Sequence, residues 1–185
     1  MPFGARVIEL TQRDYGLRTW VREWPDGLVQ LDTLPVHTGW RLLPAVTAKA
    51  QAHGLTRTTY RGDFTVAADI VAGECVETVT VPGPYMPRRL DPIPHGYVFT
   101  GKLWVPETGV RFFHVTGYDC ASLTIDDWTI DGRKRFQGAV NLEKGYHDFR
   151  VILANREELE RMRIQWRRPS EDRYRDIPDG NFFVE

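Results

Sequence analysis

Residues 97–125, YVFTGKLWVPETGVRFFHVTGYDCASLTI, decide the fold of this chain. In an extended strand Phe99, Leu103 and Val105 share one face, and Gly101 leaves room on that face for a neighbouring ring or backbone. Residues 106–109, PETG, have the composition of a turn, and the alternation of apolar and polar side chains resumes at residue 110. The stretch therefore predicts half-buried strands around a tight turn, and not a helix.

The same two-residue period recurs along the chain. Alternating strands are expected at residues 6–10, 64–70, 75–81, 97–105 and 110–116. Many short strands separated by proline and glycine turns are typical of a sandwich or a barrel. We predict an all-β fold, a two-sheet antiparallel β-sandwich with at least seven strands. Its core should contain Phe99, Leu103, Phe113, Leu123, Ile125, Leu142, Val151 and Trp166.

One domain is predicted, a single β-sandwich at residues 16–185, with residues 1–15 as an N-terminal arm. Two stretches have helical alternatives. Residues 43–53 are rich in alanine and end before Gly54, which favours a short helix there. Residues 156–162 carry charges of both signs around Leu159, which fits either a helical turn or a polar hairpin loop.

The charges of the chain nearly cancel. It has 24 lysines and arginines against 25 aspartates and glutamates, for a formal net charge of -1. The arginines of residues 156–175 alternate with acidic residues, which indicates a salt-bridged surface more than a track for phosphates. No apolar run approaches the roughly 20 residues of a membrane helix. Neither nucleic acid nor a membrane is therefore expected as a partner.

No catalytic residue can be assigned, so the chain is predicted not to be an enzyme. Cys75 and Cys120 are its only cysteines, and neither lies near a histidine pair at metal-ligand spacing, which excludes a structural zinc site. Two free buried thiols are expected, with one disulfide as the alternative. The motifs of serine hydrolases, zinc proteases and phosphate-binding loops are absent. A nucleophile pair of Cys120 and His114 lacks a third member.

From Gly96 onward the chain resembles the protective-antigen (PA14) domain, a β-sandwich of glycosidases, fungal adhesins and bacterial toxins. Residues 99–109 are similar to the family's strand and turn, and residues 117–126, GYDCASLTID, resemble its pattern of serine, two aspartates and glycine before a strand. Shorter matches follow in family order at residues 138–142, 145–147, 149–151, 164–166, 169 and 177–178. Residues 55–95 have no counterpart and are expected to be an insertion. The resemblance implies a lectin-like sandwich.

The resemblance also implies where a ligand would bind. In calcium-dependent members two consecutive aspartates hold the ion that grips sugar hydroxyls, and the matching positions here are Tyr118 and Asp119. Because calcium takes about six to eight oxygen ligands, the loss of one carboxylate argues against an ion. No cofactor is therefore expected, and Asp119 is the one candidate metal ligand. Ligand-binding loops are predicted around Tyr118, Asp119, Asp127 and Trp128, although the acidic pair before Trp128 also fits a plain turn.

Three functions remain open at this point. The first is a non-catalytic attachment module that binds a glycan, such as a host-surface polysaccharide, since aromatic rings stack on sugar faces. Four tryptophans exceed the evident needs of the core, so at least one is expected to be exposed: Trp24, Trp40, Trp104 and Trp128. The second is a structural assembly protein without sugar affinity. The third is an accessory carbohydrate-binding domain of a secreted glycosidase system.

The expected location is extracellular or on a virion. Members of the PA14 family act outside cells, whereas this sequence begins without a signal-peptide pattern and shows no lipid anchor. A bacteriophage protein, placed on the capsid or tail in multiple copies beside other virion structural proteins, would leave the cell by lysis. Multiple copies would also let weak sugar contacts add. The alternative is a cellular domain whose signal has been removed.

Overall fold

The computed structural model describes residues 6–12, 17–23, 29–35, 42–47, 52–85, 94–116, 120–132, 135–155 and 162–185. Within these residues the chain is mostly β-strand. Two short 3-10 helices complete the described elements, η2 (Ala67–Ala72) and η3 (Asp179–Asn181). The predicted all-β fold is therefore confirmed.

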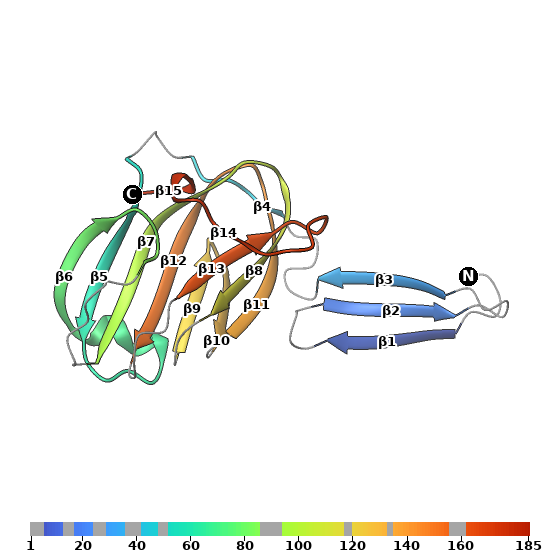
Figure 1. Cartoon of the computed structure of the whole chain (residues 1–185), viewed down its shortest axis with the longest axis horizontal. Coiled ribbons are helices and arrows are strands. Elements are labelled where there is room, and N and C mark those ends of the chain that lie inside the picture. Colours follow the sequence, from blue (N-terminus) through green and yellow to red (C-terminus); the bar gives the residue numbers. More distant parts are fainter. Residues whose placement is uncertain are drawn as a thin grey trace.

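The larger sheet of the sandwich has seven strands in the order β10-β9-β12-β7-β5-β6, with β15 also beside β7 (Figure 1). All of its pairings are antiparallel. The central strands β7 and β12 pair over eleven residues, which makes them the spine of the sheet. The strands are β5 (Leu55–Arg61), β6 (Glu74–Val81), β7 (His95–Val105), β9 (Cys120–Ile125), β10 (Trp128–Gly132), β12 (Gly145–Asn155) and β15 (Phe182–Phe183).

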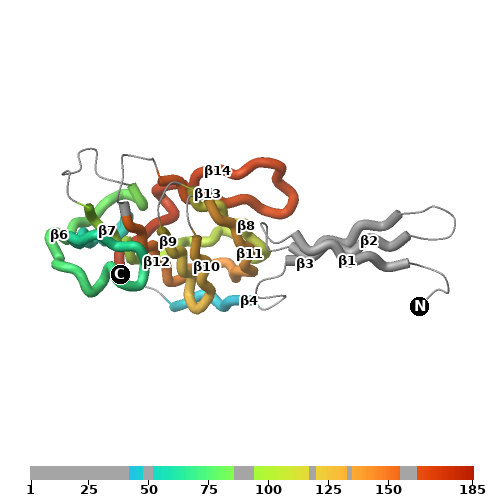
Figure 2. Tube along the Cα trace, turned by 90° about the horizontal axis from the view of Figure 1, so that it is seen from below, coloured from blue at the N-terminus to red at the C-terminus, as the bar shows by residue number. Residues whose placement is uncertain are grey.

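The smaller sheet has five strands in the order β14-β13-β8-β11-β4, and Figure 2 shows them following one another from β14 to β4. The pair β4 and β11 is parallel and the other pairs are antiparallel. Because β7 and β8 belong to different sheets, the turn at residues 106–108 carries the chain from one layer to the other. The strands are β4 (Leu42–Leu43), β8 (Gly109–Thr116), β11 (Arg135–Leu142), β13 (Arg163–Arg167) and β14 (Arg175–Asp176).

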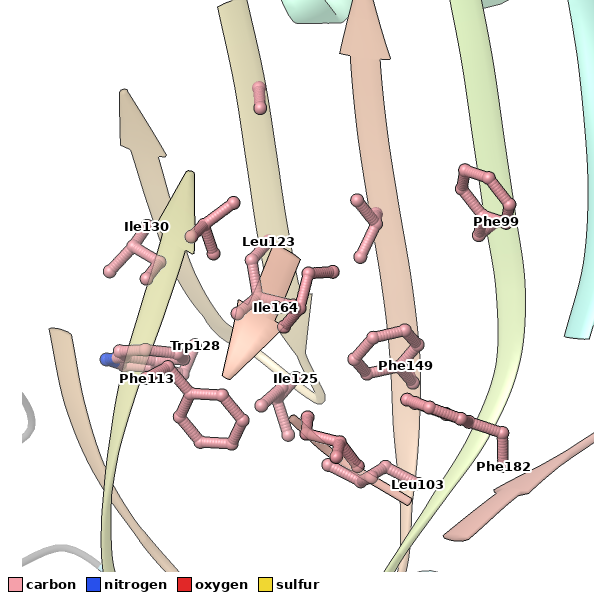
Figure 3. Packing of buried hydrophobic residues seen from close by; sticks show 14 of the residues in the cluster. Phe99, Leu103, Phe113, Leu123, Ile125, Trp128, Ile130, Phe149, Ile164 and Phe182 are labelled. Atoms are coloured by element: carbon pink, nitrogen blue, oxygen red, sulfur yellow. The ribbon is translucent and has the colours of Figure 1, made fainter. Parts of the chain in front are cut away.

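Apolar side chains of both sheets fill the space between the layers (Figure 3). The alternation puts every second residue of each strand on this inner face. The core prediction is confirmed for the seven residues that are at most 1% exposed: Phe99, Leu103, Phe113, Leu123, Ile125, Leu142 and Val151. It is wrong for Trp166, which packs against the core but is only half-buried. Its strand β13 is a short one beside the two-residue edge strand β14, so less of the layer covers its ring.

Gly101 shows why the pattern of β7 needs a residue without a side chain. A Cβ atom at this position would lie 2.4 Å from the carbonyl oxygen of Phe183 and 2.7 Å from Cδ2 of Leu55. The predicted close approach of a neighbouring backbone is therefore present, and it allows β15 to pair with β7.

A second apolar cluster lies on the outer face of the larger sheet. Ile70 of η2 is fully buried there, and Val98, Cys120 and Ile152 belong to the same cluster. The strand predicted at residues 64–70 is therefore wrong, because Phe64 and Ile70 are both buried in this cluster and residues 67–72 form a 3-10 helix. A Cβ atom at Gly96 would lie 2.5 Å from Cγ2 of Ile70, so the close packing of η2 depends on that glycine.

The first three strands form a separate antiparallel sheet, in the order β1 (Arg6–Gln12), β2 (Leu17–Glu23), β3 (Val29–Pro35). Because β1 pairs with β2 over its whole length, the domain boundary predicted at residue 15 falls inside this sheet. Strands β2 and β3 belong to neither sheet of the sandwich, so the sandwich sheets start at β4 and not at residue 16.

The described part of residues 43–53 does not form the expected helix. Leu43 is 1% exposed in β4, and Val46 forms a β-bridge with Tyr146. Burial of Leu43 between the sheets therefore outweighs the helical preference of the alanines. Residues 156–161 lie outside the described residues. In residues 55–95, β5 and β6 form the edge of the larger sheet, and their lack of a counterpart in the PA14 family stays a prediction.

Candidate functional site

The sequence predicted ligand-binding loops around four residues, and the structure describes two of them, Asp127 and Trp128. Tyr118 and Asp119 lie outside the described residues, directly before Cys120, where β9 begins. Asp127 follows the other end of β9 and is exposed in a turn. A strand of this length spans roughly 17 Å, so Cys120 and Asp127 mark opposite ends of the sandwich. The predicted ligand-binding role of Tyr118 and Asp119 stays a prediction.

Trp128 is a core residue and not part of an exposed loop. It is 5% exposed, and its ring centroid lies 6.0 Å from that of Phe113. A Cβ atom at Gly138 would lie 2.8 Å from Cζ2 of Trp128, so the indole fills the space that this glycine leaves. The predicted ligand-binding role of Trp128 is wrong, because pairing with Ile125 puts it in a strand whose inner face is buried. Trp104 is half-buried, and Trp24 and Trp40 lie outside the described residues.

The turn after β9 holds a buried charge pair. Asp126 has a φ of 52°, in the left-handed region that aspartate tolerates better than most residues. Its Oδ1 accepts a hydrogen bond from the backbone N–H of Asp148 at 2.8 Å, and its Oδ2 lies 2.6 Å from Nδ1 of His147. Nε2 of His147 lies 2.8 Å from the carbonyl oxygen of Glu143. This arrangement ties the β9–β10 turn to β12 and to the turn before it.

His147 is fully buried, and both of its ring nitrogens face hydrogen-bond acceptors. The arrangement is satisfied when each nitrogen carries a proton, which makes the ring a cation beside an ionised carboxylate. Burial lowers the pKa of His147, but the hydrogen bonds that its ring donates to the Asp126 carboxylate and to the Glu143 carbonyl outweigh this effect and raise the pKa overall. His147 therefore has a structural role, holding the β9–β10 turn against β12.

The described residues do not bring the catalytic candidates together. His114 lies on the outer face of the smaller sheet, where its ring centroid is 5.1 Å from that of Tyr174. Cys120 is buried against the outer face of the larger sheet, so the two are separated by the whole sandwich. Cys75 is exposed in β6 and no disulfide joins it to Cys120, which corrects the expectation of two buried thiols. No three metal-binding side chains gather among the described residues.

A cleft of about 300 Å³ opens at the end of the sandwich where β8 begins. Its wall includes the half-buried ring of Trp166, and we call it the Trp166 cleft. Polar groups of several kinds surround the ring: Glu107, Arg111, Glu171, Arg175 and Asn181. The candidates Tyr118 and Asp119 do not line this cleft as it is described, and they lie outside the described residues.

Hydrogen bonds and ion pairs fix the polar wall of the Trp166 cleft. Arg168 pairs with Glu107 at 3.0 Å and with Glu171 at 3.2 Å. The guanidinium carbon of Arg167 lies 4.4 Å from the ring centroid of Phe112 and 5.2 Å from that of Tyr174. The side chain of Asn181 donates to the carbonyl of Trp104 at 2.7 Å. The salt-bridged surface predicted from the alternating charges is therefore present, and it forms one side of a cleft.

A second cleft of about 290 Å³ lies between the loop after β6 and the edge of the smaller sheet. Its wall is mostly apolar and includes Ile164, Ile177 and Phe182, with Tyr85 49% exposed at the rim. The phenol of Tyr85 donates to Asp179, and this hydrogen bond is the main reason that the pKa of Tyr85 is raised to about 12. The cleft offers few polar groups to orient a ligand.

The Trp166 cleft could not be predicted directly from the sequence. Its residues come from two separated segments, at residues 106–111 and 166–181. No spacing motif connects these segments, and β14 and β15 are too short to be recognised from alternation. The one available sign was the tryptophan itself, which the alternation assigned to the core.

Three solved structures show what the fold is similar to. The PA14 domain of the antifreeze protein MpAFP matches with a TM-score of 0.59 and 15% identity, over 75% of this chain and 94% of that domain. The A domain of epithelial adhesin 9 from Candida glabrata, solved in complex with Galb1-3GlcNAc, matches with a TM-score of 0.59 and 11% identity, over 76% of this chain and 93% of that one. The predicted PA14-like β-sandwich is thereby confirmed as a fold.

An anti-sigma factor domain-containing protein matches with a TM-score of 0.61 and 15% identity over 91% of this chain. This chain spans 59% of the length of that protein. No protein-family model matches the sequence, and the comparison with curated proteins finds no match.

Proposed function

We propose that this chain is a non-catalytic glycan-binding module and that the Trp166 cleft is its binding site. The observation that carries the proposal is the half-buried indole of Trp166 in a concave polar wall. Sugars combine apolar ring faces with many hydroxyls, so their sites need an aromatic surface beside fixed donors and acceptors. Arg175, Glu171 and Asn181 line the same cleft and provide groups of both kinds.

The fold supports this proposal independently of the cleft. The structure of the Candida glabrata adhesin domain contains a disaccharide, so the same sandwich holds a glycan in that protein. The cleft carboxylates also argue for binding and against catalysis. Glu107 and Glu171 are both engaged by Arg168, whereas a glycosidase needs one carboxylic acid and one carboxylate directed at a substrate.

Tyr118 and Asp119, which lie outside the described residues, remain a proposed second contact. No helix of the described residues is long and apolar enough to cross a membrane. We infer an extracellular setting, with display on a bacteriophage particle as its more specific form. A cleft of this size gives weak single contacts, which many copies on one particle would multiply.

Replacement of Trp166 tests the proposed site. We expect Trp166→Leu to weaken binding to its best ligand on a glycan array by about tenfold, because the flat stacking surface is lost while apolar packing is kept. Trp104→Leu is the matched control, since Trp104 is also half-buried but packs on Tyr146, with ring centroids 4.8 Å apart, on the outer face of the larger sheet.

The outcomes of this test differ clearly. Equal loss of binding in both variants, with both still folded by circular dichroism, would count against a site at Trp166. A wild-type chain that binds no glycan, alone or displayed on a particle in many copies, would favour a structural assembly protein. Loss only in an Asp119→Ala variant would move the site to that residue.

A further inference from the structure

The guanidinium of Arg111 is a buried charge in the Trp166 cleft. Arg111 is 4% exposed, and its guanidinium carbon lies 5.8 Å from the ring centroid of Trp166. Nη1 donates to the carbonyl oxygen of Val110 at 3.2 Å, and Nη2 donates to that of Glu107 at 2.9 Å. These two bonds use only part of the five N–H donors of a guanidinium.

No carboxylate of the described residues forms an ion pair with Arg111. Of the three carboxylates that line the cleft, Glu107 and Glu171 are bound by Arg168, and Asp176 accepts a hydrogen bond from Gln165. Burial lowers the pKa of Arg111, and the positive charge of Arg168 lowers it further, while Glu107 and Glu171 compensate only in part. A buried cation without a close counter-ion is costly, because it has lost water without gaining a full partner.

We propose that the Trp166 cleft selects acidic sugars, and that Arg111 binds the carboxylate of the ligand. The inference deepens the proposed function and rests on it. The planar fork of a guanidinium fits a carboxylate with two parallel hydrogen bonds, and the indole beside it would carry the apolar face of the same sugar ring. The ligand then supplies the counter-ion that the chain itself does not.

The other cleft arginines are less suited to this role. Arg167 is held between two aromatic rings and donates to the carbonyl of Glu171 at 2.9 Å. Arg168 is 45% exposed and already paired with two carboxylates. A purely structural Arg111 would hold the turn before β8 through its two carbonyl contacts and would have no effect on ligand choice. Charge selection therefore separates the two roles.

The test compares each acidic glycan with its own neutral form. The full chain is measured on an array of uronate- and sialate-containing oligosaccharides beside the same oligosaccharides with each carboxyl group reduced to an alcohol. We expect the acidic forms to bind at least about tenfold more tightly, because a charge-assisted hydrogen bond to the carboxylate adds that much affinity. Arg111→Met should remove this preference while neutral glycans still bind. Arg163→Met, at an exposed arginine of the same strand as Trp166 that does not line the cleft, should leave the preference in place.

Each outcome bears on the proposed selection of acidic sugars by Arg111. Equal binding of acidic and reduced forms would overturn the inference and leave the proposed function standing. A preference that survives in Arg111→Met, or one that is lost equally in Arg163→Met, would also overturn it, because the charge would then act from elsewhere. Failure of the folded wild-type chain to bind any glycan would overturn the proposed function as well.

Discussion

Two buried cations at the same end of the sandwich have opposite surroundings. His147 is fully buried and has a carboxylate oxygen of Asp126 at 2.6 Å and a backbone carbonyl at 2.8 Å. Arg111 is 4% exposed. Its guanidinium donates to two backbone carbonyls, lies near the indole of Trp166 and lines an open cleft. The first charge is compensated within the chain, whereas the second is not.

The presence or absence of a carboxylate partner separates a charge that stabilises the fold from a charge that can bind a ligand. A buried ion pair is strongly destabilised when one partner is removed, because the other charge is left in a poor solvent. A buried ion without a close counter-ion has no such partner to lose. Burial alone therefore does not distinguish the two roles, and the presence of a carboxylate partner does.

The largest effect should follow from loss of the Asp126 carboxylate. We expect Asp126→Ala to lower the free energy of unfolding by about 3 to 5 kcal/mol, because His147 loses its counter-ion and alanine tolerates the positive φ poorly. Urea denaturation followed by tryptophan fluorescence measures the loss.

The matched variant Asp126→Asn should be much milder. Its amide can accept from the N–H of Asp148 and donate to a neutral His147, and asparagine tolerates the same backbone conformation. A cost as large as that of Asp126→Ala would show that shape and not charge explains the effect.

The pH dependence of stability provides the next test. The pKa of His147 is raised above 6.5 in the folded chain, so its stabilising contribution is complete below about pH 6.5 and is lost as the pH rises through the folded value. We expect the free energy of unfolding to fall in this window by at most about 1.4 kcal/mol per pH unit.

Another histidine acts outside this window. Burial, and then Arg135, lowers the pKa of His114, so this residue weakens the fold only as the pH falls below about 6.5.

Asp126→Asn is the control for His147, and it should flatten the profile of unfolding free energy against pH above about pH 6.5. A wild-type profile that stays flat or rises there would contradict the assignment of a charged His147.

Arg111→Met should change stability far less than Asp126→Ala. The variant removes an uncompensated buried charge and keeps much of the side-chain volume, so we expect a change within about 1 kcal/mol of zero in the free energy of unfolding. A loss of several kcal/mol in the same denaturation assay would mean that Arg111 is as structural as His147. The comparison between the two cations would then fail.

Calcium should have the smallest effect. The described residues contain no cluster of three or more metal-binding side chains, and the position beside Asp119 is Tyr118 in the sequence. We expect millimolar calcium to leave the melting temperature unchanged in differential scanning fluorimetry. An increase that a chelator reverses would indicate an ion bound by the folded state.

Some elements could be predicted from the sequence and others could not, for identifiable reasons. Strands β7 and β8 were predictable because Phe99, Leu103 and Phe113 alternate with polar residues over long stretches. The 3-10 helix η2 was not predictable, since Phe64 and Ile70 follow the two-residue period of a strand. In the structure both residues pack on the outer face of the larger sheet. Trp128 was misplaced because an acidic turn and a following core strand give the same local pattern as an exposed loop.

The sequence by itself determined the class of fold, the inward face of β7, β8 and β9, and the need for a glycine at position 101. These features depend on the two-residue period and on backbone space, which neighbouring residues define. Only the tertiary structure decided that Trp166 and Arg111 share one cleft and that His147 has a carboxylate partner. Such contacts join segments far apart in the chain, and a buried charge can be interpreted only when the groups around it are known.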